Sequence, residues 1–151
     1  MIRTLSFTTY IARSVPDVYE HLANPQNFIG LQPLLIEMSP VQSAMINGAT
    51  VQSYETVEAF RLGGHVVYRN RIRVETTLTK PNEQMDSRVR SPGGVTLHVR
   101  YTFTAYNGST QLAEVMDIHM SRLVAGFVVR QATQAQTAVM ARLKARLEVA
   151  L

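Results

Sequence analysis

Hydrophobic and polar residues alternate with a period of two along the middle of the chain, from Asn47 to about Ser121. Such alternation is typical of strands that have one buried face and one solvated face. Short runs of turn-forming residues interrupt it, and short connections between consecutive strands predict antiparallel hairpins. The interruptions are Asn47-Gly48, Gly63-Gly64, Lys80-Pro81-Asn82, Pro92-Gly93-Gly94 and Asn107-Gly108.

Two of the predicted strands show the alternation most clearly. In residues 95–105 the odd positions are apolar or aromatic, whereas the even positions are polar. In residues 68–75 the even positions form the predicted inner face, and arginines occupy three of the odd positions. If Asn107-Gly108 makes a two-residue turn, His98 falls opposite Asp117, and a register one step further sets it opposite His119.

The first forty residues mix strand and helix signals. Residues 2–11 are rich in Thr, Tyr, Phe and Ile, a composition typical of strands. Ser14 is a suitable helix cap, and Asn24-Pro25 stops the helix that follows it. The predicted elements are a strand over 2–11, a helix from Pro16 to about Ala23, a helical turn over Gln26–Gly30 and a strand over Leu34–Gln42.

The period changes to that of a helix from about Leu123 to Leu147. A helix of ~25 residues is close to 37 Å long at 1.5 Å per residue. It can lie across a whole sheet, and its apolar stripe must be buried against something. That stripe consists of Val124, Val128, Ala132, Ala135, Val139, Leu143 and Leu147.

The composition bounds the class of protein. The chain has 151 residues, of which 46% are hydrophobic, so we expect a single domain over residues 1–151. The absence of cysteine excludes a disulfide framework, a thiolate nucleophile and cysteine-ligated zinc. The first residues lack the apolar core of a signal peptide, and the longest apolar run, Leu123–Val129, is far shorter than the ~20 residues that span a bilayer. We therefore expect a cytoplasmic protein without a membrane span.

Arginine dominates the positive charge of the chain, which has a net charge of +4 and a pI near 9.8. Glu75 and Asp86 interleave with arginines on the predicted outer sheet face, and stacking aromatic residues are not obvious there. We expect a solvated, partly paired face and no nucleic acid as partner, and macromolecular binding through this stripe is a weaker alternative. The stripe comprises Arg69, Arg71, Arg73, Arg88, Arg90 and Arg100.

Three short motifs stand out along the chain. Residues 11–25, IARSVPDVYEHLANP, end an apolar strand and continue with the pattern V-[WYF]-x-x-[LI]-x-[DN]-P, residues 48–51 are GATV, and residues 143–148 are LKARLE. These motifs are similar to the opening, to the start of the third strand and to the close of the last helix in the START-like (SRPBCC) superfamily, and the order of elements resembles that superfamily as well. Its members include the birch-allergen fold, polyketide cyclases and dehydrases, and lipid-transfer domains.

This resemblance implies an α+β helix-grip fold. In that fold a curved seven-stranded antiparallel sheet wraps around the long C-terminal helix, and two short helices follow the first strand. A strongly curved sheet and one long helix cannot pack flush along their whole length. We therefore expect a gap between them that is filled either by side chains or by a ligand.

The predicted inner face contains a carboxylate, Glu114, between Leu112 and Met116. A buried carboxylate must be hydrogen-bonded, paired or protonated, because burying it bare is very costly. One interpretation is a ligand anchor or general acid/base deep in the cavity. The other is a carboxylate near the rim, or one that is satisfied by a tyrosine hydroxyl.

Other inner-face side chains suit an apolar ligand. Tyr68 and Tyr101 offer ring surface with a polar handle, as does the lining of many ligand sites. Asn70 either orients a ligand carbonyl or hydroxyl, or bonds a neighbouring side chain. For Phe103 ordinary core packing is the favoured interpretation.

These observations predict a domain that binds a hydrophobic or amphipathic small molecule, such as a lipid or polyketide, rather than an enzyme. The alternative is a polyketide cyclase/aromatase or hydrolyase type of enzyme, as some relatives in the resembled family are, with Glu114 and Tyr101 as acid/base. The four histidines lie on separate elements and no nucleotide-binding fingerprint is present, so we predict no metal site and no cofactor. We expect a monomer or homodimer. The predicted ligand-binding residues are Tyr68, Asn70, Tyr101, Phe103, Glu114, Met116, Val124, Val128 and Ala132.

Overall fold

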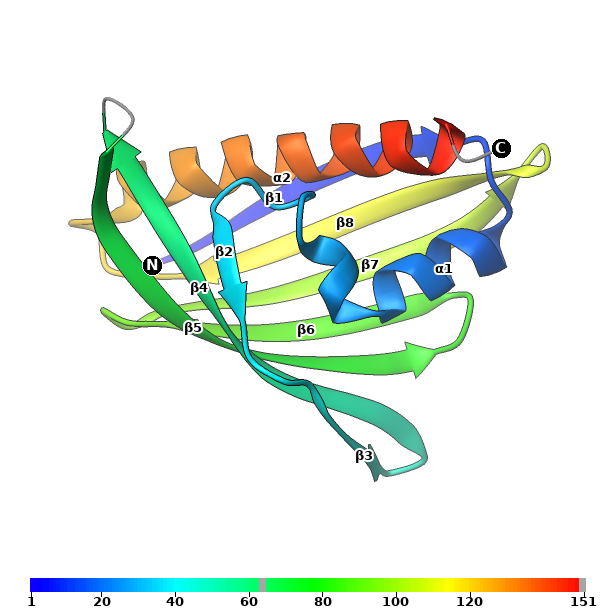
Figure 1. Cartoon of the computed structure of the whole chain (residues 1–151), viewed down its shortest axis with the longest axis horizontal. Coiled ribbons are helices and arrows are strands. Elements are labelled where there is room, and N and C mark those ends of the chain that lie inside the picture. Colours follow the sequence, from blue (N-terminus) through cyan, green and yellow to red (C-terminus); the bar gives the residue numbers. More distant parts are fainter. Residues whose placement is uncertain (63–64, 150–151) are drawn as a thin grey trace.

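The computed structural model describes residues 1–62 and 65–149. These residues form eight strands, two α-helices and one 3-10 helix, and the long C-terminal helix lies across the sheet (Figure 1). In chain order the elements are β1 (Ile2–Ile11), α1 (Val15–Ala23), η1 (Pro25–Phe28), β2 (Leu35–Met38), β3 (Gln42–Ile46), β4 (Ala49–Leu62), β5 (His65–Lys80), β6 (Gln84–Ser91), β7 (Val95–Tyr106), β8 (Ser109–His119) and α2 (Ala125–Val149).

Two Asn-Gly pairs make tight hairpin turns, as predicted. Asn47 and Gly48 have φ of 51° and 81°, and Asn107 and Gly108 have φ of 49° and 79°. Positive φ at both central residues matches the twist of the flanking strands. The second turn pairs β7 with β8 so that His98 lies opposite Asp117, which confirms the first of the two registers considered. The predicted turn at Gly63-Gly64 lies outside the described residues.

The strands form one antiparallel sheet in the order β1-β8-β7-β6-β5-β4-β2, and β3 also pairs with β4. The edge beside β4 differs from the single strand expected over Leu34–Gln42, because β2 ends before Pro40 and β3 begins after it. Proline has no N–H for the ladder, so an edge strand breaks there. Ser39 bridges the break, since its N–H donates to the Glu55 carbonyl and its hydroxyl accepts from the Glu55 N–H, both at 2.8 Å. The helix-grip fold is therefore confirmed, with its edge strand in two pieces.

The short helices after β1 begin at side-chain caps. The Ser14 hydroxyl accepts from the N–H of Asp17 at 3.4 Å, and the Asn24 side chain accepts from the N–H of Gln26 at 3.2 Å. The second helical turn is a 3-10 helix, η1. Arg146 of α2 fixes the chain that leaves it, because the guanidinium donates to the carbonyls of Asn27 at 2.6 Å and Ile29 at 3.0 Å.

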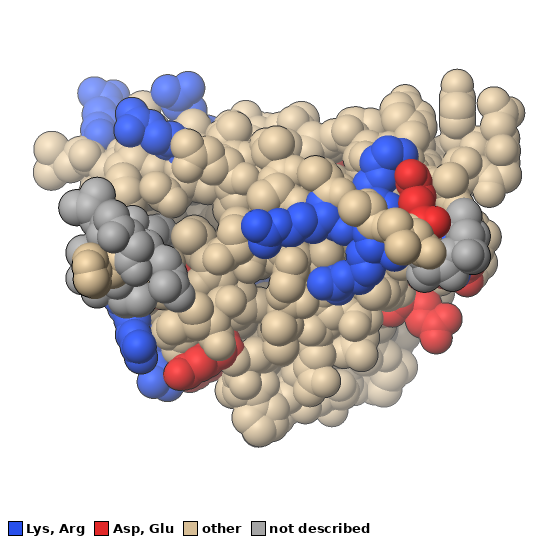
Figure 2. All heavy atoms as spheres, turned by 45° about the horizontal axis from the view of Figure 1, so that its top comes forward, with Lys and Arg blue, Asp and Glu red and all other residues tan. Residues whose placement is uncertain are grey.

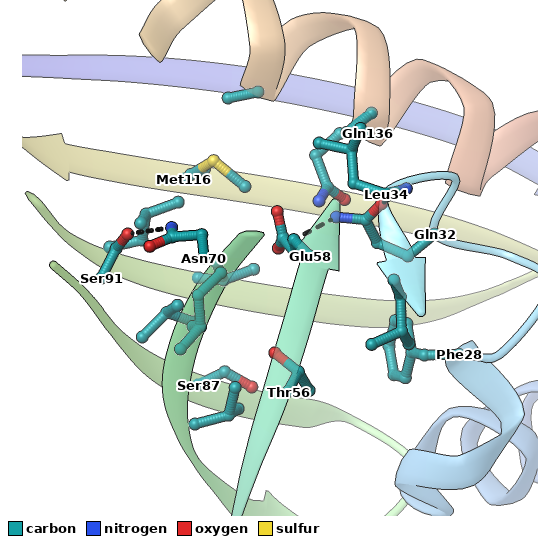
Figure 3. A pocket seen from close by; sticks show the side chains of 18 of the residues that line it. Phe28, Gln32, Leu34, Thr56, Glu58, Asn70, Ser87, Ser91, Met116 and Gln136 are labelled. Atoms are coloured by element: carbon teal, nitrogen blue, oxygen red, sulfur yellow. Dashed lines mark hydrogen bonds between the residues drawn. The ribbon is translucent and has the colours of Figure 1, made fainter. Parts of the chain in front are cut away.

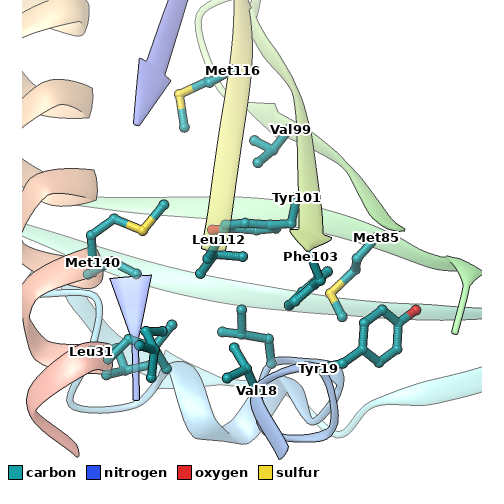
Figure 4. Close-up of a cluster of buried hydrophobic side chains, with 14 of the residues drawn as sticks. Val18, Tyr19, Leu31, Met85, Val99, Tyr101, Phe103, Leu112, Met116 and Met140 are labelled. Carbon is teal, nitrogen blue, oxygen red and sulfur yellow. The ribbon is translucent and has the colours of Figure 1, made fainter. Parts of the chain in front are cut away.

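The C-terminal half of α2 packs into the main hydrophobic core. Its inward side chains at Val139, Met140, Leu143 and Leu147 are buried, and side chains from α1, β6, β7 and β8 complete the cluster. Figure 4 shows this cluster where α1 meets the sheet. Neither α1 nor α2 has the length and apolar character that crossing a membrane requires, and this holds for the described residues.

Candidate functional site

A cavity of about 410 Å³ lies between the sheet and the N-terminal half of α2. Side chains of α1 pack in the core with the C-terminal half of that helix, so the gap left by the curved sheet opens at the other half. The volume is in the range of ligand pockets in proteins. The helix side of the wall is formed by Val124, Phe127, Val128, Gln131, Ala132, Ala135 and Gln136.

Eight of the nine predicted site residues line this cavity, and one does not. Tyr68 and Val124 lie at its mouth, with 53% and 37% of their surfaces exposed. Phe103 lies outside the cavity in the core, where its ring meets that of Tyr19 edge-on at a centroid distance of 4.8 Å. The residues that line the cavity are Tyr68, Asn70, Tyr101, Glu114, Met116, Val124, Val128 and Ala132.

Glu114 is 1% exposed and lies deep in the cavity, on the face of β8 that carries the buried apolar side chains. Its neighbour across the ladder is Tyr101 of β7, whose hydroxyl hydrogen-bonds the carboxyl group. The Gln136 amide, with its nitrogen turned toward Glu114, lies 3.1 and 3.2 Å from the two carboxyl oxygens. Burial raises the pKa of Glu114 to about 8, although the Tyr101 hydrogen bond opposes the rise. Near neutral pH this carboxyl group is therefore mostly protonated.

Asn70 belongs to a polar network near the mouth (Figure 3). Its amide nitrogen donates to the Ser91 hydroxyl at 2.6 Å, and its oxygen accepts from the Tyr68 hydroxyl at 3.5 Å. Of the two roles considered for Asn70, bonding to a neighbouring side chain is the one present in this structure. The network fixes the amide orientation and directs its nitrogen to Ser91.

Glu58 of β4 is a second carboxyl group in the cavity, and it is not among the residues predicted from the sequence. It is the cross-strand neighbour of Asn70, and Gln32 donates a hydrogen bond to it at 3.3 Å. Burial raises its pKa to about 7. The inner face of β4 is largely polar, so alternation alone favours the opposite face as the buried one. Glu58 can be identified through the pairing of β4 with β5. The inner face of β5 is evident from its alternation, and Asn70 on that face lies opposite Glu58.

Gln52 is a further missed residue, at the end of the cavity beside α1. Its side chain is buried, and its nitrogen donates to the Ala23 carbonyl at 2.7 Å. Its oxygen is buried without a hydrogen-bond partner. Next to it on β5 and β6, the hydroxyls of Thr76 and Ser87 bond each other at 2.8 Å. The cavity is thus apolar with polar groups grouped at separate points along it.

The arginine stripe lies on the outer sheet face and is partly paired. Arg71 and Arg73 both reach Glu55, at 3.3 and 3.5 Å, and Arg100 reaches Asp86 at 2.9 Å. Exposed pairs of this kind contribute little to stability. On the side of the molecule that carries α2, the basic side chains lie in separate groups with uncharged surface between them (Figure 2). The described residues therefore fit the expected solvated, partly paired face.

No protein-family model matches the sequence, and no curated protein matches it. Similarity appears in solved structures instead. A START superfamily protein from Mycobacterium smegmatis superposes with a TM-score of 0.75 at 14% identity, covering 98% of this chain and 99% of the other.

Two further solved structures agree along their whole length. The Zhui aromatase/cyclase from Streptomyces sp. R1128 has a TM-score of 0.73 at 16% identity, covering 99% of this chain and 98% of the other. The protein TTHA0849 from Thermus thermophilus has a TM-score of 0.74 at 13% identity, covering 98% of this chain and 99% of the other. The chain therefore has the START-like helix-grip fold.

Proposed function

We propose that the protein binds a hydrophobic or amphipathic small molecule in the cavity between the sheet and α2. The observation that carries this proposal is the cavity of about 410 Å³, walled by aliphatic and aromatic side chains and supplied with a few polar groups at fixed points. Sites of this composition take apolar ligands and use the polar groups for orientation. The START-like fold supports the proposal, because it is a ligand-binding fold.

The driving force is removal of apolar ligand surface from water. This transfer is worth about 25 cal/mol per Å² before the ordering costs of binding are subtracted. Val128 and Ala132 of α2 and Met116 of β8 supply apolar wall, and Met116 has a flexible thioether that adapts to ligand shape. Tyr68 and Glu114, at the mouth and in the depth of the cavity, orient the ligand.

Two measurements test this proposal together. Native mass spectrometry of the purified protein is expected to show additional mass from a co-purified apolar molecule. Titration with the neutral fluorescent probe N-phenyl-1-naphthylamine is expected to give saturable emission enhancement with a stoichiometry of one. Protein that carries no extra mass and gives no saturable probe signal contradicts the proposal.

A second candidate function is a cyclase or aromatase type of reaction. The observation that favours it is the buried Glu114–Tyr101 pair, since a carboxyl group with a pKa near 8 can donate a proton to a ligand carbonyl at neutral pH. Under this reading Glu114 is the general acid, and Tyr101 holds its carboxyl group in position. An aromatase/cyclase is among the proteins that share the fold.

The variant Glu114→Gln separates this candidate from simple binding. It removes the acidic proton but retains the shape and a hydrogen-bonding group. If the protein is a cyclase, turnover of a linear poly-β-ketone falls at least a hundredfold while circular dichroism and probe binding stay unchanged. Equal turnover in the variant and the parent protein contradicts the acid role.

The sequence-based expectations of a cytoplasmic location, of one domain over the chain and of a monomer or homodimer stay predictions. Gel filtration with light scattering tests the oligomeric state. Binding of a macromolecule through the outer arginine stripe stays a weaker alternative. If the stripe binds nucleic acid, nucleic acid should co-elute with the protein at low salt and dissociate steeply as the salt concentration rises.

A further inference from the structure

The described lining of the cavity contains two carboxyl groups and no basic side chain. Among the described residues that line it, Glu58 of β4 and Glu114 of β8 are the acids, and no Lys, Arg or His is present. An ion that is buried without a partner of opposite charge loses its hydration free energy, and no attractive interaction offsets that loss. The described residues therefore supply no countercharge for either carboxyl group inside the cavity.

The neutral polar groups of the cavity do not replace the missing positive charge. Four of the five amides that line the cavity direct their nitrogens to protein acceptors: Gln32 to Glu58, Gln52 to the Ala23 carbonyl, Asn70 to Ser91 and Gln136 to Glu114. The Gln52 oxygen, on a side chain that is nine-tenths buried, accepts nothing. What the cavity offers a ligand is thus mostly hydrogen-bond acceptors.

Of the two carboxyl groups, Glu58 has the weaker internal support. Glu114 interacts with both Tyr101 and Gln136, whereas Gln32 at 3.3 Å is the one hydrogen-bond donor to Glu58 within the described chain. Figure 3 shows the side chains of Glu58 and Gln136 directed toward the same space, whereas the Asn70 amide turns toward Ser91. Glu58 lies on β4, which pairs with β5, the strand of the mouth residue Tyr68.

We infer that the cavity selects a hydrophobic ligand that carries a protonated amine, and that Glu58 is the carboxylate that binds the ammonium group. This inference rests on the proposed binding function and specifies the class of ligand. The ammonium group supplies the missing countercharge and donates to acceptors that the protein leaves open. An anionic amphiphile such as a fatty acid is disfavoured by repulsion from the ionised form of Glu58, and the neutral acid Glu114 offers it no positive charge.

The ionisable groups that share the cavity with Glu58 come from four strands. They are Glu114 of β8 and the tyrosines of β4, β5 and β7, whereas η1, β2, β6 and α2 contribute none within the described residues. Because an ammonium ligand binds the ionised form of Glu58, its apparent affinity follows the ionised fraction. With the pKa near 7, that fraction falls about tenfold between pH 8 and pH 6.

Displacement of N-phenyl-1-naphthylamine by three ligands of equal chain length tests the inference: decylamine, decanol and decanoic acid. At pH 8 we expect decylamine to bind at least tenfold more tightly than decanol, and decanoic acid to bind most weakly. We expect the preference for the amine to fall about tenfold at pH 6. Glu58→Gln removes both the preference and its pH dependence, and Glu114→Gln retains the preference.

Glu55→Gln is the matched control, because Glu55 lies on the outer face of the same strand and pairs with Arg71. It is expected to behave as the parent protein does. If the probe binds but decylamine shows no advantage over decanol, or if Glu58→Gln keeps that advantage, the inference is overturned while the proposed function stands. Loss of the preference in Glu114→Gln alone overturns the assignment to Glu58. A probe that fails to bind the parent protein overturns the proposed function itself.

Discussion

Tyr101 of β7 and Glu114 of β8 face each other directly across the strand ladder, and their side chains are hydrogen-bonded in the interior. Both are almost fully buried. Burial and the neighbouring Glu114 charge raise the pKa of Tyr101 well above its ordinary value, so its hydroxyl stays protonated and serves as a donor. The pair therefore places a neutral carboxylic acid at the base of the cavity over the physiological pH range.

This pair makes stability depend on pH, with a sign that follows from the raised pKa. Between about pH 4.5 and pH 8 the folded state retains the Glu114 proton and the unfolded state releases it, so the free energy of unfolding falls as pH rises. For Glu114→Gln we expect the loss between pH 5.5 and pH 9 to be smaller by about 3 kcal/mol. Urea denaturation of both proteins at the two pH values measures the difference.

The raised pKa of Glu58 also lowers the free energy of unfolding as pH rises, so both the parent protein and the variant are less stable at high pH. The test is the difference between the two slopes. If the two proteins lose equal stability between pH 5.5 and pH 9, Glu114 is already ionised in the folded state at low pH and the assignment of a buried neutral acid is wrong.

Arg146 joins the end of α2 to the chain between η1 and β2. It donates to the carbonyls of Asn27 and Ile29 and lies 3.2 Å from a His21 ring nitrogen. Hydrogen bonds to charged groups contribute about 1.5–3 kcal/mol, so Arg146→Ala is expected to cost about 2 kcal/mol of unfolding free energy. Arg142→Ala is the control, because its one long bond, at 3.4 Å to Gly30, is exposed. Equal losses in the two variants would contradict this account.

A substitution at Phe103 distinguishes a core-packing role from a ligand-binding role for this residue. Its ring packs against Tyr19 outside the cavity, so Phe103→Leu is expected to lower stability by about 1–2 kcal/mol without changing probe affinity by more than twofold. Thermal unfolding and the fluorescence titration measure the two effects separately. A large loss of probe affinity in a folded variant would place Phe103 back among the ligand contacts.

The sequence predicts the fold well because the fold depends on local signals. The Asn-Gly pairs fix hairpin register through their positive φ, and the helical period of residues 123–147 has no competing interpretation. The clear alternation of β7 and β8 also places Tyr101 and Glu114 correctly on the inner face. These features need only short-range chemistry, which a single sequence contains.

The sequence predicts the polar cavity residues poorly, because polar side chains that face a cavity lie on the face of a strand that is usually apolar. The inner face of β4 carries Gln52 and Glu58, which face the cavity and not a packed core. Alternation assigns such residues to solvent. Gln136 is missed for a similar reason, since a polar residue on a helix is ordinarily read as solvent-exposed. Only long-range pairing of β4 with β5 and the placement of α2 bring these side chains to the cavity.

Ligand entry into the space under the N-terminal half of α2 can be blocked by filling that space with a side chain. Ala132 lines the cavity, whereas Ala141 lies on the exposed face of the same helix. In fluorescence titrations with N-phenyl-1-naphthylamine, Ala132→Trp is expected to bind the probe at least tenfold more weakly than Ala141→Trp, with both variants folded by circular dichroism. Equal probe affinity in the two folded variants would contradict the account.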